Sequence, residues 1–143
     1  MAVTIQLRGR QIFLKNVEKY RKKQGRKLEE ALHASALVVQ NDARRSILKG
    51  PKTGRIYPRG KRSSHQASAP GEAPASDTGT LVRNILAEMD PRKLFVRIIA
   101  KTKYSLFLEE GTKKMKPRPF LRPALERNLR KITAIFQAKL REL

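Results

Sequence analysis

The chain has 143 residues, no cysteine, and 33 lysines and arginines against 12 aspartates and glutamates, which gives a formal net charge of +21. This length predicts one domain, residues 1–143, with a sizeable core, and the lack of cysteine excludes disulfide and thiol chemistry. No apolar run is long enough to span a bilayer and the first residues lack a secretory pattern, so we expect a cytosolic origin and no membrane partner. The charge favours a polyanion or a strongly acidic protein as partner, without deciding between them.

The N-terminal third predicts a short strand and then helix. Val3–Leu7 alternates apolar and polar residues with period two, which indicates a strand. Residues 12–20 have loosely helical spacing, and Gly25 within a basic run indicates a break. From Arg26 to Leu48 apolar or small residues repeat every three or four positions, which predicts a long helix packed closely against a sheet or another helix. This stripe consists of Leu28, Leu32, Ser35, Ala36, Val39, Ala43 and Ile47.

Residues 49–77, which we call the basic arm, differ sharply in composition from the helix before them. Glycine, proline, serine, alanine and basic residues dominate, and so long a connection without a periodic pattern is usually functional or disordered. The arm has too few apolar residues to offset the entropy of ordering, so we expect it to be extended and flexible in the free subunit. The residues predicted to contact DNA or a protein partner are Lys52, Arg55, Tyr57, Arg59, Lys61 and Arg62.

Two strands and a closing helix are predicted in the C-terminal half. Ile85–Met89 and Leu94–Ala100 flank a turn in which Pro91 suits the second position. The second strand is apolar on much of both faces, which suits helices on one side and a neighbouring subunit on the other. Residues 104–110 fit a short strand or a helical turn equally well. A helix opened by Pro123 follows, and its apolar stripe is Leu125, Leu129, Ile132, Phe136 and Leu140.

The segment Tyr104–Pro123 joins these parts. Its apolar run ends at Glu109, Glu110 and Gly111, where a glycine with positive φ allows a sharp turn. Prolines 117, 119 and 123 then stiffen the backbone on both sides of Phe120. We expect Phe120 to occupy an apolar pocket in this subunit or the next, and the two glutamates to pair with arginines.

Two blocks of sequence resemble one family. The first is Tyr104 followed by Glu109, Gly111 and Thr112, and then Arg-Pro-Phe-Leu-Arg-Pro-Ala from Arg118. The second runs from Thr53-Gly54-Arg55-Ile56-Tyr57 through the His65–Pro74 stretch to Thr78-Gly79-Thr80-Leu81. In order and spacing these blocks resemble the tail-component family of tailed bacteriophages, the neck, head–tail joining or tail-completion proteins.

The resemblance implies an α+β fold, in which a small antiparallel sheet packs with a long N-terminal helix and a C-terminal helix. The long basic loop is part of the same domain. It also implies a structural virion protein that forms a ring, commonly of six copies, around the DNA channel at the neck. The expected partners are further copies of itself, the head connector or adaptor, and the tail terminator or tail tube, with possible non-specific DNA contact. We expect it in the virion, and in the host cytoplasm during assembly. The predicted subunit or partner interface is Tyr104, Glu110, Gly111, Thr112, Arg118, Pro119, Phe120 and Arg122.

Other functions have less support in the sequence. The two histidines are too few and too isolated for a metal site, and no serine or threonine has an identifiable base, so neither an enzyme nor a cofactor is predicted. Sequence-specific nucleic-acid motifs are lacking, and binding would be to phosphates alone. A ribosome- or nucleoid-associated basic protein is the alternative, which a salt-sensitive affinity for RNA or DNA would distinguish.

Overall fold

The protein is built along one long helix, α1 (Arg10–Lys49). The computed structural model describes residues 10–61, 63–90 and 92–142; the predicted strand Val3–Leu7, Arg62 and Pro91 lie outside them. The helix is continuous through Gly25, so the predicted break is wrong. A glycine in a helix interior costs about 1 kcal/mol relative to alanine. It leaves the backbone hydrogen bonds intact, and its lysine, glutamine and arginine neighbours are good helix formers.

The second long helix, α4 (Leu121–Arg141), runs antiparallel to α1. Asp42 on α1 bonds Arg127 and Asn128 near the start of α4, whereas Lys27 on α1 pairs with Glu142 just beyond its end. The helix begins two residues before Pro123, which therefore lies in the first turn, where its missing N–H costs no hydrogen bond.

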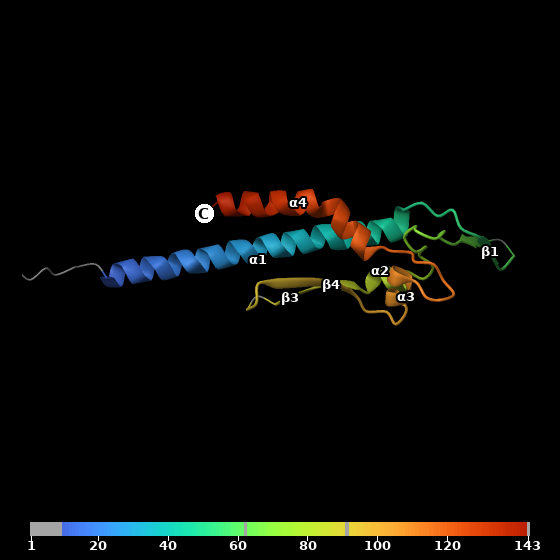
Figure 1. The fold of residues 1–143 in the computed structure, drawn as a ribbon, viewed down its shortest axis with the longest axis horizontal. Coiled ribbons are helices and arrows are strands. Elements are labelled where there is room, and N and C mark those ends of the chain that lie inside the picture. Colours follow the sequence, from blue (N-terminus) through green and yellow to red (C-terminus); the bar gives the residue numbers. More distant parts are fainter. Residues whose placement is uncertain (1–9, 62, 91, 143) are drawn as a thin grey trace, which may run out of the picture.

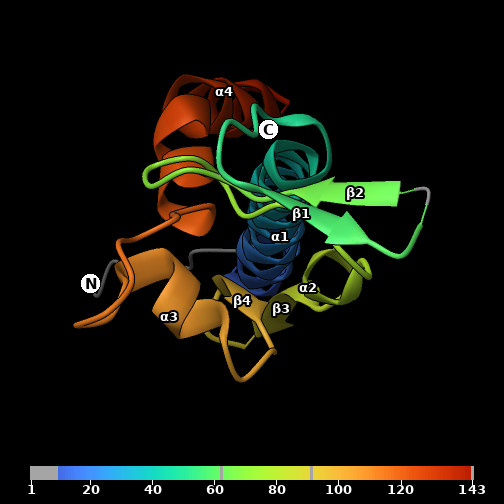
Figure 2. The ribbon, with the colours of Figure 1, turned by 90° about the vertical axis from the view of Figure 1, so that its right-hand side faces the viewer.

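A β-hairpin covers the opposite side of α1. Strands β3 (Ile85–Asp90) and β4 (Phe95–Ala100) are antiparallel, with Leu86 opposite Ile99. The predicted pair of strands is therefore confirmed, although Leu94 lies in the turn with a φ of 47° rather than in the strand. Figure 1 shows α4 and this hairpin on the two sides of α1, and Figure 2 shows the same layers looking along that helix.

The core lies where these three layers meet, towards the C-terminal end of α1. Its helix contribution includes Ala43, which is fully buried and allows the neighbouring elements to approach closely. The side-chain amide of Gln40 and the guanidinium of Arg44 both donate to the carbonyl of Ile85, which joins α1 to the start of β3 at 2.7 Å each. The buried core consists of Val39, Ala43, Ile47, Leu81, Ile85, Phe120 and Ala124.

Four short elements complete the fold. Strands β1 (Ile56–Arg59) and β2 (Ser63–Gln66) form a second antiparallel hairpin within the basic arm, which composition did not predict. Helix α2 (Thr80–Arg83) leads into β3. Helix α3 (Ser105–Glu110) shows that the ambiguous segment is helical. The α+β class is confirmed, with two separate two-stranded sheets. Within the described ranges, no helix is long and apolar enough to cross a membrane.

Candidate functional site

The turn after α3 has the geometry that the sequence predicts. Gly111 ends the helix with a φ of 79°, and its N–H donates to the carbonyl of Phe107 at 2.9 Å. A Cβ at this position would lie 2.8 Å from the carbonyl oxygen of Met115 and 2.9 Å from the nitrogen of Pro117. Both the positive φ and this close approach require glycine, so no other residue at this position would allow the same turn.

Glu109 connects α3 to the start of α4. Its carboxylate accepts hydrogen bonds from the backbone N–H groups of Phe120 at 2.8 Å, Leu121 at 3.0 Å and Arg122 at 2.8 Å. These amides have no partner inside the helix, so the carboxylate satisfies them and places a negative charge at the positive end of α4. The expectation that Glu109 pairs with an arginine is therefore wrong.

Phe120 is turned into the subunit's own core. Its side chain is 1% exposed and packs in the cluster that includes Ile47 and Ile85. It thus occupies an apolar pocket of this chain, the first of the two expected locations. Gly111, Arg118 and Pro119 are half-buried. The exposed members of the predicted interface set are Tyr104, Glu110, Thr112 and Arg122.

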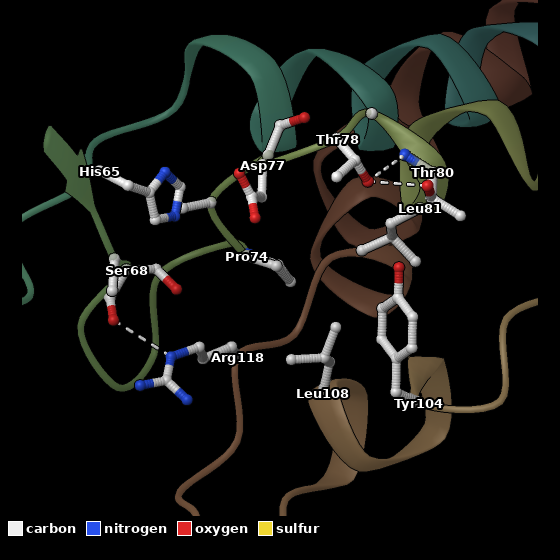
Figure 3. A pocket seen from close by; sticks show the side chains of 14 residues that line it. His65, Ser68, Pro74, Asp77, Thr78, Thr80, Leu81, Tyr104, Leu108 and Arg118 are labelled. Atoms are coloured by element: carbon white, nitrogen blue, oxygen red, sulfur yellow. Dashed lines mark hydrogen bonds between the residues drawn. The ribbon is translucent and has the colours of Figure 1, made fainter. Parts of the chain in front are cut away.

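A cleft of about 440 Å³ separates the basic arm from α3 (Figure 3). Tyr104 and Arg118 line it on one side, and His65, Ser68 and Asp77 line it on the other. The Nε of Arg118 donates to the carbonyl of Ser68 at 3.1 Å, which attaches the 111–120 segment to the arm. Within the described residues, no hydrogen bond joins His65 to Asp77 or Ser68.

The remaining predicted interface residues do not join this cleft. Glu110, Pro119 and Arg122 lie together around a separate hollow between the end of α3 and the start of α4. The structure therefore does not gather the set into one site: Tyr104 and Arg118 line the cleft, Glu110, Pro119 and Arg122 line the hollow, and Phe120 is buried in the core.

The arm is held closed at its base by Glu72. Its carboxylate accepts from the Thr53 hydroxyl at 2.6 Å, the Thr53 N–H at 2.9 Å and the Ala69 N–H at 2.8 Å. The hydroxyl hydrogen bond, followed by those from the two backbone amides, lowers the pKa of Glu72. Gly54 pairs with Ala67 beside this point, and a Cβ on Gly54 would lie 2.6 Å from the Ala67 carbonyl oxygen.

Part of the arm's positive charge is used inside the chain. The ammonium of Lys52 donates to the carbonyl of Ser46 at 3.0 Å, and its burial lowers its pKa. Arg59 forms an ion pair with Asp77. Arg55 stacks over the ring of Tyr57, 5.5 Å from the centroid, while Tyr57 and Lys61 are exposed. The arm presents less free charge to a partner than its composition suggests.

An apolar groove of about 420 Å³, absent from the predicted site, lies between α1, α4 and β4. The sequence shows the apolar stripes of the two helices and the strand that is apolar on both faces. It does not show that these three elements fail to cover one another completely. Leu125 remains 46% exposed at the edge of this groove. Its lining is Leu32, Ser35, Ala36, Val39, Val96, Ile98, Leu121, Arg122, Leu125, Ile132 and Phe136.

Within the described part of the chain, no cluster of histidine, aspartate or glutamate side chains could hold a metal ion. Residues 12–111 match the HK97-gp10-like family, described as "Bacteriophage HK97-gp10, putative tail-component". The match includes most of α1, the arm and β3–β4, and it ends before the Arg118–Pro123 segment and α4. No curated protein and no solved structure matches the chain significantly.

Proposed function

The chain belongs to the HK97-gp10-like family of putative bacteriophage tail components, and from this we propose that it forms a ring at the phage neck. The ring completes the end of the tail and joins it to the head connector around the passage taken by DNA. Its partners are further copies of the chain, the connector or adaptor, and the tail terminator or tail tube. Membership alone supports only the coarser role, a structural protein of the phage tail.

The open apolar groove carries this proposal. The apolar lining of the groove supports a protein occupant, because covering apolar surface lowers the free energy by about 25 cal/mol per Å². Phosphates have no affinity for such a surface, so the groove favours protein assembly over a purely nucleic-acid-binding role. A groove that receives a different surface of the next copy makes a head-to-tail contact, and such contacts form a ring when the rotation between neighbouring copies closes.

The charge gives assembly a further requirement. Six copies, each at +21, would carry a formal total of +126, and this repulsion opposes closure at low salt. DNA in the channel or an acidic neighbouring ring would supply the opposing charge. We therefore expect the isolated chain to be a monomer or a loose oligomer that closes into a ring on the tail end or connector.

The test places a charge in the groove. Leu125→Glu should leave circular dichroism and thermal unfolding near wild type, because Leu125 is half-exposed, but prevent joining of heads to tails. Leu140→Glu is the matched control, since Leu140 lies on the same helix, is 45% exposed and does not line the groove. Complementation of a phage lacking this gene, with electron microscopy of the particles, gives the readout. Normal joined particles from the Leu125 variant would overturn the proposal.

A further inference from the structure

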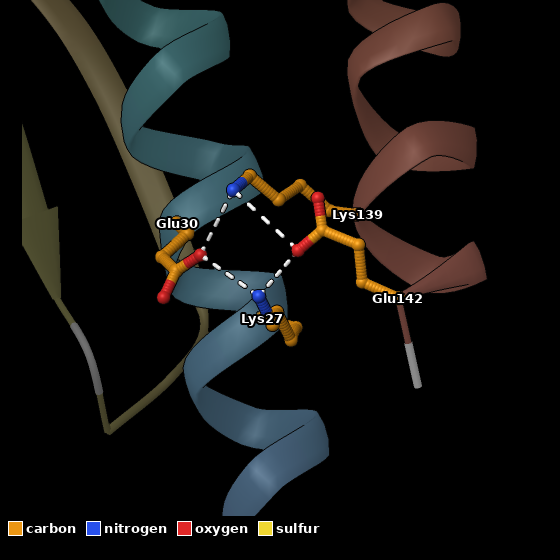
Figure 4. Close-up of polar contacts among 4 residues, drawn as sticks. All are labelled: Lys27, Glu30, Lys139 and Glu142. Carbon is orange, nitrogen blue, oxygen red and sulfur yellow. Dashed lines mark hydrogen bonds and ion pairs between the residues drawn. The ribbon is translucent and has the colours of Figure 1, made fainter.

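The N-terminal part of α1 projects beyond the rest of the molecule (Figure 1). Near the end of α4 the two helices are joined by ion pairs of Lys27 with Glu142 and of Lys139 with Glu30, within a cluster of four charged residues (Figure 4). Before that cluster every residue from Leu14 to Lys23 is exposed. We call residues 14–26 the projecting segment.

The projecting segment has two different faces. Lys15, Lys19, Lys22 and Arg26 are spaced by four, three and four residues and lie together along one side of the helix. On the side facing away from this row, Leu14 and Val17 are 52% and 39% exposed. Such a helix can lie against protein with one face while the row of cations points outward.

Little in the chain neutralises this row. Its one carboxylate, Glu18, pairs with Lys22 at 3.2 Å, and both side chains are well exposed. Within the described residues, Lys15, Lys19, Lys23 and Arg26 form no ion pair with an acidic group. In the body, by contrast, Glu30, Glu88 and Glu142 each contact two cations, and Asp42 and Asp77 each contact one. Three of the four cations in the row therefore have no carboxylate partner among the described residues, as do other cations of the body such as Lys113, Lys114 and Lys116.

We propose that the cationic row of the projecting segment binds the phosphate backbone of duplex DNA without sequence preference. The row from Lys15 to Arg26 is about 17 Å long at 1.5 Å per residue. One DNA strand presents about five phosphates over that length, at 3.4 Å spacing. Lysines suit such a target because they act as mobile point charges and impose no bidentate geometry.

Other polyanions fit less well. An interfacial membrane helix needs a broad apolar face with bulky anchors. Within residues 14–26 the large apolar side chains are Leu14, Val17 and Tyr20. An acidic protein surface would require a matched pattern of carboxylates, whereas the repeating phosphates of DNA accept a simple row. This DNA contact is independent of ring closure, because the isolated chain should show it.

The experiment measures binding of a fluorescent 30-base-pair duplex between about 50 and 300 mM NaCl. The test variant is Lys15→Gln, Lys19→Gln, Lys22→Gln and Arg26→Gln combined, in which glutamine preserves helix propensity. Each lost phosphate contact removes about 0.9 from the slope of log affinity against log salt. The slope should therefore become shallower by about 3–4 units, with at least about a tenfold loss of affinity at the lowest salt. Two unrelated duplex sequences should behave alike.

The matched control removes the same number of charges from the basic arm, as Arg55→Gln, Arg59→Gln, Lys61→Gln and Arg62→Gln combined. We expect a smaller change of slope, since Arg59 already pairs with Asp77. Equal changes in both variants would mean that the whole-chain field binds DNA, and would overturn the proposal. An unchanged slope in the test variant would also overturn the proposal. So would a test variant that keeps its affinity for DNA and loses binding only to vesicles containing phosphatidylserine or to polyglutamate. Circular dichroism of both variants checks that the helix is retained.

Discussion

The two halves of α1 are one continuous helix with opposite surroundings. In the C-terminal half Ala31, Ala43 and Ile47 are completely or almost completely buried, because α4 and β3–β4 cover them. In the projecting segment Leu14 and Tyr20 are about half exposed. Isolated helices of about 13 residues are marginal in water. Apolar spacing and helix propensity therefore explain why both halves are helical. Tertiary contacts with α4 and the hairpin stabilise only the C-terminal half.

The largest expected effect comes from removing the anchor of the packed half. Phe120→Ala deletes a buried ring and should lower the free energy of unfolding by about 3–5 kcal/mol. Phe107→Ala is the matched control, since Phe107 is 52% exposed, and it should cost far less. Urea denaturation followed by circular dichroism measures both. Similar losses in the two variants would show that the core has been placed wrongly.

A smaller effect is expected where α4 begins. Glu109→Ala leaves three backbone N–H groups without their carboxylate acceptor and should destabilise the fold by about 1–2 kcal/mol, the upper part of the range for helix caps. Glu110→Ala removes the neighbouring exposed glutamate, for which the described residues show no ion pair, and should be nearly neutral. If the two urea midpoints shift equally, the cap does not stabilise α4.

The junction of the two halves can be strengthened instead of broken. Gly25 lies inside the helix, and a Cβ there meets nothing within 4 Å. Gly25→Ala should therefore stabilise the helix locally by about 0.5–1 kcal/mol and slow amide hydrogen exchange in residues 14–24. Gly60→Ala, which has similar space but a φ of 63°, should destabilise its turn. Unchanged exchange in the projecting segment of the Gly25 variant would contradict the continuous helix.

The smallest effect concerns acid and the basic arm. The pKa of Glu72 is lowered in the folded chain, from 4.5, by the Thr53 hydroxyl and then by the backbone amides of Thr53 and Ala69. Its contribution to stability is therefore present above its unfolded pKa and is lost as the pH falls through its lower folded value. Limited proteolysis between residues 49 and 77 should accelerate in that acidic range in wild type. In Glu72→Gln, proteolysis of this segment should already be faster than in wild type at pH 7. If the wild-type protein were cleaved equally fast at pH 7 and in the acidic range, the role of Glu72 would be contradicted.

Much of the fold was predictable because its signals are local. The stripes of α1 and α4, the β3–β4 hairpin and the turn at Gly111 each follow from spacing or from one backbone requirement. The break at Gly25 was predicted wrongly because a local penalty of about 1 kcal/mol is small beside the propensity of its neighbours.

The details of the candidate site were not predictable because they depend on distant partners. Glu109 caps amides 11 to 13 residues later, and Arg118 bonds a carbonyl 50 residues earlier. The strands of the β1–β2 hairpin have no alternation of apolar and polar residues, so the sequence shows no periodic signal for them. The hairpin is instead held at its base by the hydrogen bonds of Glu72. The groove results from incomplete coverage among three elements, a property of their spacing in three dimensions.

The contacts of Glu109 join the family-matched part of the chain to the start of α4. A fragment trimmed to the family-matched residues, which end at 111, would keep the carboxylate and lose the three amides that it caps. It would also lose Phe120 and Ala124, and leave the side of α1 that packs against α4 facing water. The cooperative unit thus extends beyond the boundary that family similarity draws, and α4 is an integral part of it rather than an appendage.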